Sequence, residues 1–135
     1  MSKLKDTTNR ALAAWNEKDL ESYFQLYDRD ARIHGLAPMM VGLDGATEVY
    51  QAFFSAFPDI HTHVEDMIED GETLAVRYHV HGTHHGEFQG IPATEREIMI
   101  GGMSILRFVS GKVVERWNQL DRMAMLQQLG VFPTQ

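Results

Sequence analysis

The chain contains no cysteine among its 135 residues. This absence excludes disulfide bonds, thiolate nucleophiles and zinc or iron–sulfur sites built on cysteine. Basic residues are also few: 12 Lys and Arg stand against 19 Asp and Glu, for a formal net charge of −7. They are scattered and form no stripe that could neutralise phosphates, so nucleic acid is not an expected partner.

Long apolar runs are missing as well. No stretch approaches the roughly 20 residues that cross a bilayer, and the opening MSKLKDTTNR has no hydrophobic core region of a signal peptide. We therefore expect no membrane contact and a cytoplasmic protein. The hydrophobic share of 44% and the charged share of 23% are typical of an ordinary folded domain, and this length predicts one domain over 1–135.

Apolar residues at helical spacing predict helices in the first half of the chain, over residues 3–17, 19–27 and 46–57. Pro58 ends the third of these segments, because proline cannot continue a helix. A short strand is predicted over 31–36, between the second and third helices. A last helix over 122–129 is expected to end at Gly130.

From residue 59 the apolar period changes to two, which predicts strands over 59–70, 73–83, 95–109 and 112–120. Helices first, then long strands, then a closing helix indicate an α+β domain. We expect a curved antiparallel sheet that wraps around the N-terminal helices. A cavity between the two layers is where a small ligand would bind.

The register of the first hairpin decides which histidines meet. A three-residue loop, Asp70-Gly71-Glu72, separates apolar from polar side chains more cleanly than a two-residue loop does. The pairs it predicts are Val64 with Tyr78, Glu65 with Arg77, and Ile68 with Leu74.

The same register puts four histidines together on the polar face, His61 opposite His81 and His63 opposite His79. Imidazoles two residues apart on a strand could share a metal ion. Nothing in the sequence indicates the fixed supporting partners that such ligands need, so a solvated or subunit-contact face is favoured and no metal is expected. His84 continues the apolar alternation and is predicted to point inward, whereas His85 points outward.

The second hairpin singles out a carboxylate. A two-residue turn at Ser110-Gly111 would pair Gly102 with Gln119 and Ile100 with Asp121. Asp121 would then lie among mostly apolar side chains, surroundings that suit a proton-transfer group. The alternative is that Asp121 caps the helix over 122–129. The pattern alone favours neither interpretation.

Residues 56–130 closely resemble the SnoaL-like polyketide cyclase family of the NTF2-like superfamily, and residues 27–57 fit the same pattern. The resemblance is carried by the motifs FPD at 57–59, GTHHGEFQGIPAT at 82–94 and GKVVERWNQLD at 111–121. It implies a cone-shaped α+β barrel that is homodimeric or homotetrameric and uses no cofactor. It also implies an intramolecular aldol cyclisation in which an Asp at the end of the last strand, here Asp121, acts as general acid and base.

The hypothesis at this point is a cofactor-free enzyme acting on a small hydrophobic, carbonyl-containing molecule. Asp121 would remove the proton, and His34 or His84 would stabilise or protonate the resulting oxygen. The candidates to line the cavity are Trp117, Gln119, Tyr78, Phe53, Phe88 and Met103. The alternatives are a non-catalytic ligand-binding or accessory protein, or an isomerase or hydrolase. Epoxide hydrolysis ranks last because no inward Arg is expected beside Asp121.

Overall fold

The computed structural model describes residues 3–36 and 40–131. Three short helical elements and one strand come first, namely α1 (Lys3–Asn16), α2 (Leu20–Tyr23), the 3-10 helix η1 (Phe24–Leu26) and β1 (Tyr27–His34). The rest of the chain forms α3 (Leu43–Ala56), β2 (His61–Asp70), β3 (Thr73–Thr83), β4 (Glu97–Val109), β5 (Lys112–Leu120) and α4 (Arg122–Leu129). The predicted α+β class is confirmed.

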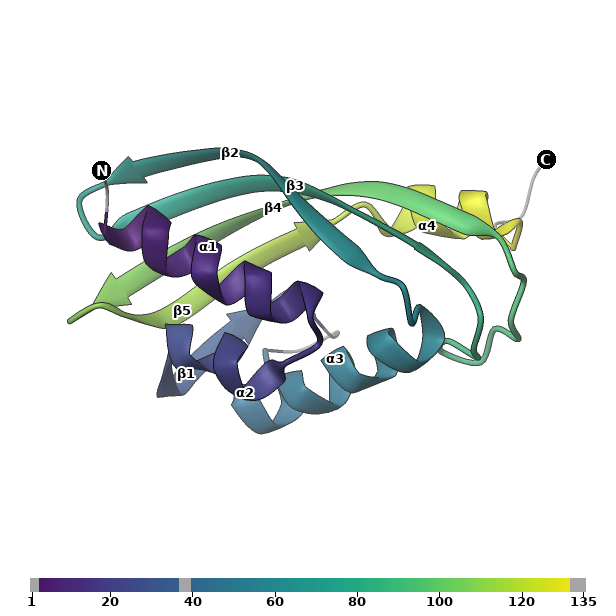
Figure 1. Cartoon of the computed structure of the whole chain (residues 1–135), viewed down its shortest axis with the longest axis horizontal. Helices are drawn as coiled ribbons and strands as arrows, with labels where there is room; N and C mark the ends of the chain where they lie inside the picture. The colour runs from purple at the N-terminus through teal and green to yellow at the C-terminus, as the bar shows by residue number, and fades with distance from the viewer. Residues whose placement is uncertain (1–2, 37–39, 132–135) are drawn as a thin grey trace.

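The five strands form one curved sheet in the order β1-β5-β4-β3-β2. Figure 1 shows this sheet arching over α1, α2 and α3, while α4 follows β5 and lies against the first part of β4. β1 pairs with β5 in parallel and the other neighbours are antiparallel, so the sheet is mixed rather than purely antiparallel as expected. None of the described helices is both long and apolar enough to cross a bilayer.

The hairpin of β2 and β3 has the predicted register at its histidine end and another at its turn. His61 pairs with His81, His63 with His79, and Val64 with Tyr78, as expected. Beyond Val64 the register shifts, because Glu65 is an extra residue in β2. This β-bulge corrects the predicted pair of Ile68 and Leu74, and the strands are joined by two residues rather than three.

The hairpin of β4 and β5 contains a second bulge, with larger consequences. Phe108 pairs with Val113 as predicted, but Arg107 pairs with Glu115, which leaves Val114 as an extra residue in β5. Because side chains alternate between faces along a strand, this one residue exchanges the two faces of β5 beyond it. Ser104 consequently pairs with Asn118 rather than with Trp117.

A glycine in β4 makes room for a tyrosine on the concave face. Gly102 pairs with Tyr78, and a Cβ atom at Gly102 would lie 2.6 Å from the Tyr78 hydroxyl oxygen. The phenol ring therefore crosses β4 at the only kind of residue that leaves it space, and its hydroxyl reaches the side chains of β5. This contact places a polar group over the inner surface of the sheet.

Candidate active site: an apolar cavity with one buried cation

A cavity of about 90 Å³ lies between the concave face of the sheet and the helices α1, α2 and α3. Most of its lining is aliphatic or aromatic. The polar side chains around it are those of Thr8, Trp15, Tyr23, Tyr27, Tyr50, Thr62, Tyr78, Ser104, Arg116 and Asn118. Mostly apolar walls with a few converging polar groups are typical of small-molecule sites.

Arg116 projects from β5 into this cavity and donates hydrogen bonds to three tyrosines. Its Nη1 lies 2.9 Å from the hydroxyl oxygen of Tyr50, 3.3 Å from that of Tyr23 and 3.5 Å from that of Tyr27. Tyr23 and Tyr27 are themselves hydrogen-bonded, with 2.8 Å between their hydroxyl oxygens. α2, β1 and α3 thus each bring one phenol to the same guanidinium.

The other side of the guanidinium faces β4 and β5. Nε and Nη2 of Arg116 donate to Ser104 Oγ at 3.1 and 2.9 Å, and Nη2 also donates to Asn118 Oδ1 at 3.0 Å. The same Asn118 oxygen accepts hydrogen bonds from Ser104 Oγ at 2.7 Å and from the Tyr78 hydroxyl at 2.5 Å. We call Arg116, Ser104, Asn118, Tyr78 and the three other tyrosines the inner cluster.

The inner cluster contains a cation but no anion. No Asp, Glu or His is among the described residues that line the cavity, and no described carboxylate forms an ion pair with Arg116. All its hydrogen-bond acceptors are neutral oxygens. Arg116 is half-buried by accessible area, but its guanidinium is enclosed by the side chains of the inner cluster. An enclosed charge without a counter-charge is costly to maintain, which makes this arrangement informative about function.

Tyr23, Tyr50 and Arg116 each keep one protonation state around neutral pH. Burial raises the pKa of Tyr50, and burial together with the neighbouring Tyr27 raises the pKa of Tyr23 well above the ordinary value. Burial alone would lower the pKa of Arg116, but the surrounding tyrosines raise it well above its ordinary value. The guanidinium is therefore charged, and these phenols are neutral hydrogen-bonding groups rather than bases.

Asp121, the expected acid/base residue, does not line the cavity. Its side chain is exposed, and its Oδ1 accepts the backbone N–H of Ala124 at 3.0 Å, so Asp121 caps the N-terminus of α4. The predicted pairing with Ile100 is wrong because of the bulge at Val114. The capping alternative describes the observed geometry.

Three of the expected lining residues lie on the outer face of the sheet. Trp117 is 39% exposed, Met103 is 61% exposed, and Gln119 pairs with Met103 and is also exposed. Trp117 and Gln119 were expected inside because the bulge at Val114 was not foreseen. Met103 follows the regular alternation of β4, in which every second residue is buried.

His34 also lies on the outer face. Its Nε2 is 2.7 Å from Glu115 Oε2, and its ring stacks on Trp117 at 5.3 Å between centroids. The hydrogen bonds from His34 and Arg107 lower the pKa of the Glu115 carboxyl. His34 is thus part of a surface ion-pair network and does not face the cavity.

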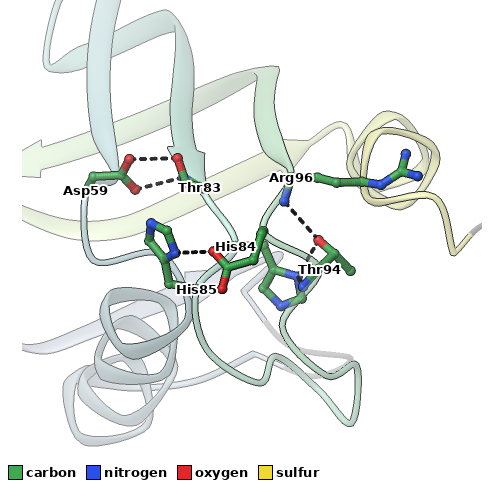
Figure 2. A network of polar contacts seen from close by, with 7 residues as sticks. Asp59, Thr83, His84, His85, Thr94 and Arg96 are labelled. Carbon is green, nitrogen blue, oxygen red and sulfur yellow. Dashed lines mark hydrogen bonds and ion pairs between the residues drawn. The ribbon is translucent and has the colours of Figure 1, made fainter.

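His84 points inward as predicted and is fully buried, but it does not line the cavity either. Its Nδ1 lies 3.0 Å from Thr94 Oγ1 and accepts the Thr94 N–H at 3.2 Å, so the ring is held against the loop between β3 and β4, as Figure 2 shows. The ring also stacks on Phe57. Nε2 has no hydrogen-bond partner among the described residues.

Two of the expected lining residues, Tyr78 and Phe53, do line the cavity. Phe88 lies one layer further out, with its ring centroid 4.9 Å from that of Phe53. It lines a second, open groove between α3, the loop at 87–89 and the start of α4. This groove shares Leu36 with the cavity.

The four histidines of the first hairpin meet on the outer face. The Nε2 atoms of His63 and His81 are 2.9 Å apart, and the ring of His63 stacks on that of His79. Burial and the like charges of His61, His79 and His81 lower the pKa of His63. Within the described ranges, no group of three or more His, Cys, Asp or Glu side chains is placed to hold a metal ion.

Sequence reasoning missed Arg116, Asn118 and Ser104 as site residues. With an unbroken alternation, Arg116 and Asn118 fall on the outer face of β5. The available signal was the adjacent pair Val113 and Val114, since two consecutive β-branched residues interrupt the alternation where the bulge lies.

Comparisons with known proteins identify the family and the fold. The family model described as SnoaL-like polyketide cyclase matches residues 5–129. The solved structures that resemble the chain are NTF2-like, and the chain belongs to the SnoaL-like polyketide cyclase family. No curated protein matches the chain.

Several solved structures resemble nearly the whole chain. AclR from Streptomyces galilaeus, a candidate hydroxylase, is 29% identical with a TM-score of 0.90, over 98% of this chain and 99% of its own. IdmH from Streptomyces antibioticus, a candidate polyketide cyclase, is 32% identical with a TM-score of 0.85, over 96% of this chain and 100% of its own. TsrD from Streptomyces laurentii, at 22% identity and a TM-score of 0.87 over 98% of this chain and 99% of its own, shares the fold.

Proposed function

We propose that the chain closes a ring in a small, largely apolar molecule that carries several carbonyl groups, by an intramolecular aldol reaction without a cofactor. Family membership supports a small-molecule substrate, and the inner cluster supports this chemistry. The observation that carries the proposal is the Arg116 guanidinium, bonded to neutral oxygens in an apolar cavity that has no carboxylate among its described residues.

The inner cluster suits the changes in charge during an aldol reaction. The enolate carbon attacks the second carbonyl carbon, a carbon–carbon bond forms, and the carbonyl π electrons move to oxygen. The alkoxide then takes a proton from a cavity hydroxyl such as that of Tyr78, and solvent restores that proton. A fixed cation and hydroxyl donors in a water-poor cavity stabilise negative oxygen without having to reorganise.

Three residues remain candidates from the sequence analysis, and of these the resemblance implies an acid/base role only for Asp121. Asp121, His34 and His84 would act as the proton-transfer groups, but none of them lines the cavity in the part of the chain that the structure describes. We therefore propose that the inner cluster contributes the main stabilisation. A catalytic role for Asp121 requires a substrate that reaches the start of α4.

The test is ring closure of a linear poly-β-carbonyl thioester, followed by mass spectrometry and by the absorbance of the cyclised product. Arg116→Met should lower the rate by about 10²- to 10³-fold, as large as the loss of one oxyanion donor, because it removes the charge and releases the hydroxyl groups that Arg116 orients. Arg107→Met is the matched control, since Arg107 is an exposed arginine that pairs with Glu115 on the outer face. Equal rates in the two variants would contradict the proposal.

A second candidate function, non-catalytic binding of a small metabolite, is favoured by one specific observation. The described cavity lining offers no carboxylate or imidazole that could remove a proton. A bound ligand would then be recovered chemically intact, whereas an enzyme would return a cyclised product. The same absence speaks against an Asp-Arg-Asp epoxide hydrolase, although Arg116 does point inward.

The homodimer or homotetramer implied by the resemblance is a further proposal. Its support is the cluster of exposed apolar side chains on the outer face, Met99, Met103, Ile105 and Trp117. Sedimentation velocity of the wild type and of Met103→Glu tests it. A monomeric wild type would contradict it.

A further inference from the structure

The charge balance of the cavity indicates in which form the substrate binds. Building on the proposed function, we infer that the cavity takes its ligand as a preformed anion, the conjugate base of a 1,3-dicarbonyl compound or of a phenol. The ligand supplies the negative charge that the protein leaves out around Arg116. The proton is lost to water or buffer before the anion enters, and no protein base takes part.

The first argument is the saturation of Arg116. Its five N–H groups are directed at Ser104, Asn118 and three tyrosine oxygens, through six contacts of 2.9 to 3.5 Å. The guanidinium geometry is thus fixed before any ligand arrives. The ligand is stabilised by the field of this charge and by hydroxyl groups that Arg116 polarises.

The second argument is that one hydrogen-bond donor of the cavity lining has no partner among the described residues. Trp15 lines the cavity, and its Nε1–H is buried without a hydrogen-bond partner among the described residues. A buried unmet donor costs about 1–3 kcal/mol, which a ligand acceptor that reaches Trp15 Nε1 would recover. Trp15 therefore favours an acceptor oxygen on the ligand, and the uncompensated charge of Arg116 favours a negative one.

The third argument is the absence of a base. A neutral carbon acid would have to lose its proton inside the cavity, where the described lining contains no carboxylate or imidazole. A compound about as acidic as an ordinary phenol, whose pKa is near 10 in tyrosine, is ionised to about one part in a thousand at pH 7, and a more acidic 1,3-dicarbonyl compound or phenol to a larger extent. Because the protein binds this anion from solution, it does not need a base of its own to remove the proton.

A nitrophenol tests this inference directly, because its phenol and phenolate forms absorb at different wavelengths. 4-Nitrophenol is titrated with protein at a pH below the pKa of the free phenol. We expect the phenolate band to rise on binding, with at least about tenfold preference for the anion, which corresponds to one pKa unit. Quenching of Trp15 fluorescence in a Trp117→Phe background, which leaves one of the two tryptophans, locates the probe in the cavity.

Two variants separate charge from shape. Arg116→Met should abolish the preference for the anion, and Arg107→Met should retain it. Should Arg116→Met fail to fold in thermal unfolding, Tyr50→Phe removes one hydroxyl of the inner cluster, keeps the ring, and should reduce the preference severalfold. An unchanged preference in every folded inner-cluster variant would overturn the inference.

The outcomes also separate this inference from the proposed function. If the probe binds as the neutral phenol, the anion inference fails while ring closure of the thioester can still occur. If neither form quenches Trp15, the cavity does not admit a phenol-sized anion and the inference fails as well. Whether ring closure depends on Arg116 is decided by the product assay alone.

Discussion

The two faces of the sheet formed by β4 and β5 each carry an arginine, in opposite electrostatic settings. On the outer face Arg107 of β4 lies 2.9 Å from Glu115, which also contacts His34, so each charge has a partner and water nearby. On the inner face Arg116 has only neutral acceptors. Exposed pairs contribute little to stability, whereas a buried unpaired charge needs a reason. The difference indicates that Arg116 interacts with a ligand, whereas Arg107 forms a surface ion pair.

One extra residue separates these two settings. Inserting one alanine between Glu115 and Arg116 would exchange the faces beyond it, which places Trp117 inside and the charged Arg116 outside. We expect loss of most of the unfolding free energy, which is typically about 5–15 kcal/mol for a domain. Urea unfolding followed by circular dichroism measures it. Deletion of Val114 is the control, because it removes the bulge but keeps every pair beyond it, and it should cost only about 0.5–3 kcal/mol. An insertion variant that still binds nitrophenolate would show that the register of β5 does not set the faces.

The bulge also explains which parts of the structure could be predicted from the sequence and which could not. The helices, the strands over 73–83 and 112–120, and the histidine pairs of β2 and β3 followed from periodicity, because long regular alternation leaves one consistent register. The resemblance identified the family. The inner side chains of β5 could not be predicted, since a bulge is a local change in hydrogen bonding that alters every later position while barely changing composition. For that reason Asp121 was predicted to point into the cavity, although it lies at the surface.

Two adjacent glycines of β4 allow the effect of one added methyl group to be compared between the inner and the outer face. A Cβ atom at Gly102 would lie 2.6 Å from the ring and hydroxyl of Tyr78, whereas one at Gly101 would meet only the Tyr78 backbone oxygen at 3.9 Å. Gly102→Ala should therefore displace the Tyr78 hydroxyl from Asn118 and cost about 1–3 kcal/mol through overpacking. Gly101→Ala should change the unfolding free energy by less than about 0.5 kcal/mol. Equal losses in thermal unfolding would contradict the assigned faces.

Two substitutions of Asp121 distinguish a helix-capping role from a catalytic role. Asp121→Ala removes the acceptor of the Ala124 N–H and should cost about 1 kcal/mol, while Asp121→Asn keeps an acceptor oxygen and should cost only a few tenths. Neither variant should change nitrophenolate binding. Both variants are measured by chemical unfolding and by the ring-closure assay. A full loss of turnover in Asp121→Asn with intact stability would restore the acid/base role that the resemblance implies.

The smallest expected effect concerns acid stability of the outer face. Hydrogen bonds from His34 and Arg107 lower the pKa of Glu115, and those from His79 and Arg77 lower that of Glu65. A carboxyl whose pKa is lower in the folded state binds fewer protons there than in the unfolded chain. Its contribution is therefore present above the unfolded value, near 4.3 for Glu, and is lost as pH falls through the lowered value.

The inner face has no such dependence in the same window, since burial raises the pKa of Tyr23 and Tyr50 and Arg116 stays charged. Glu115→Gln should thus flatten the fall in unfolding free energy below about pH 5 and leave the curve from pH 6 to 8 parallel to that of the wild type. Urea unfolding across this range gives both curves. Nitrophenolate binding measured at pH 6 should be the same in both proteins, because Glu115 lies across the sheet from the inner cluster. A binding change in Glu115→Gln as large as that of Arg116→Met would mean that the two faces are not electrostatically separate.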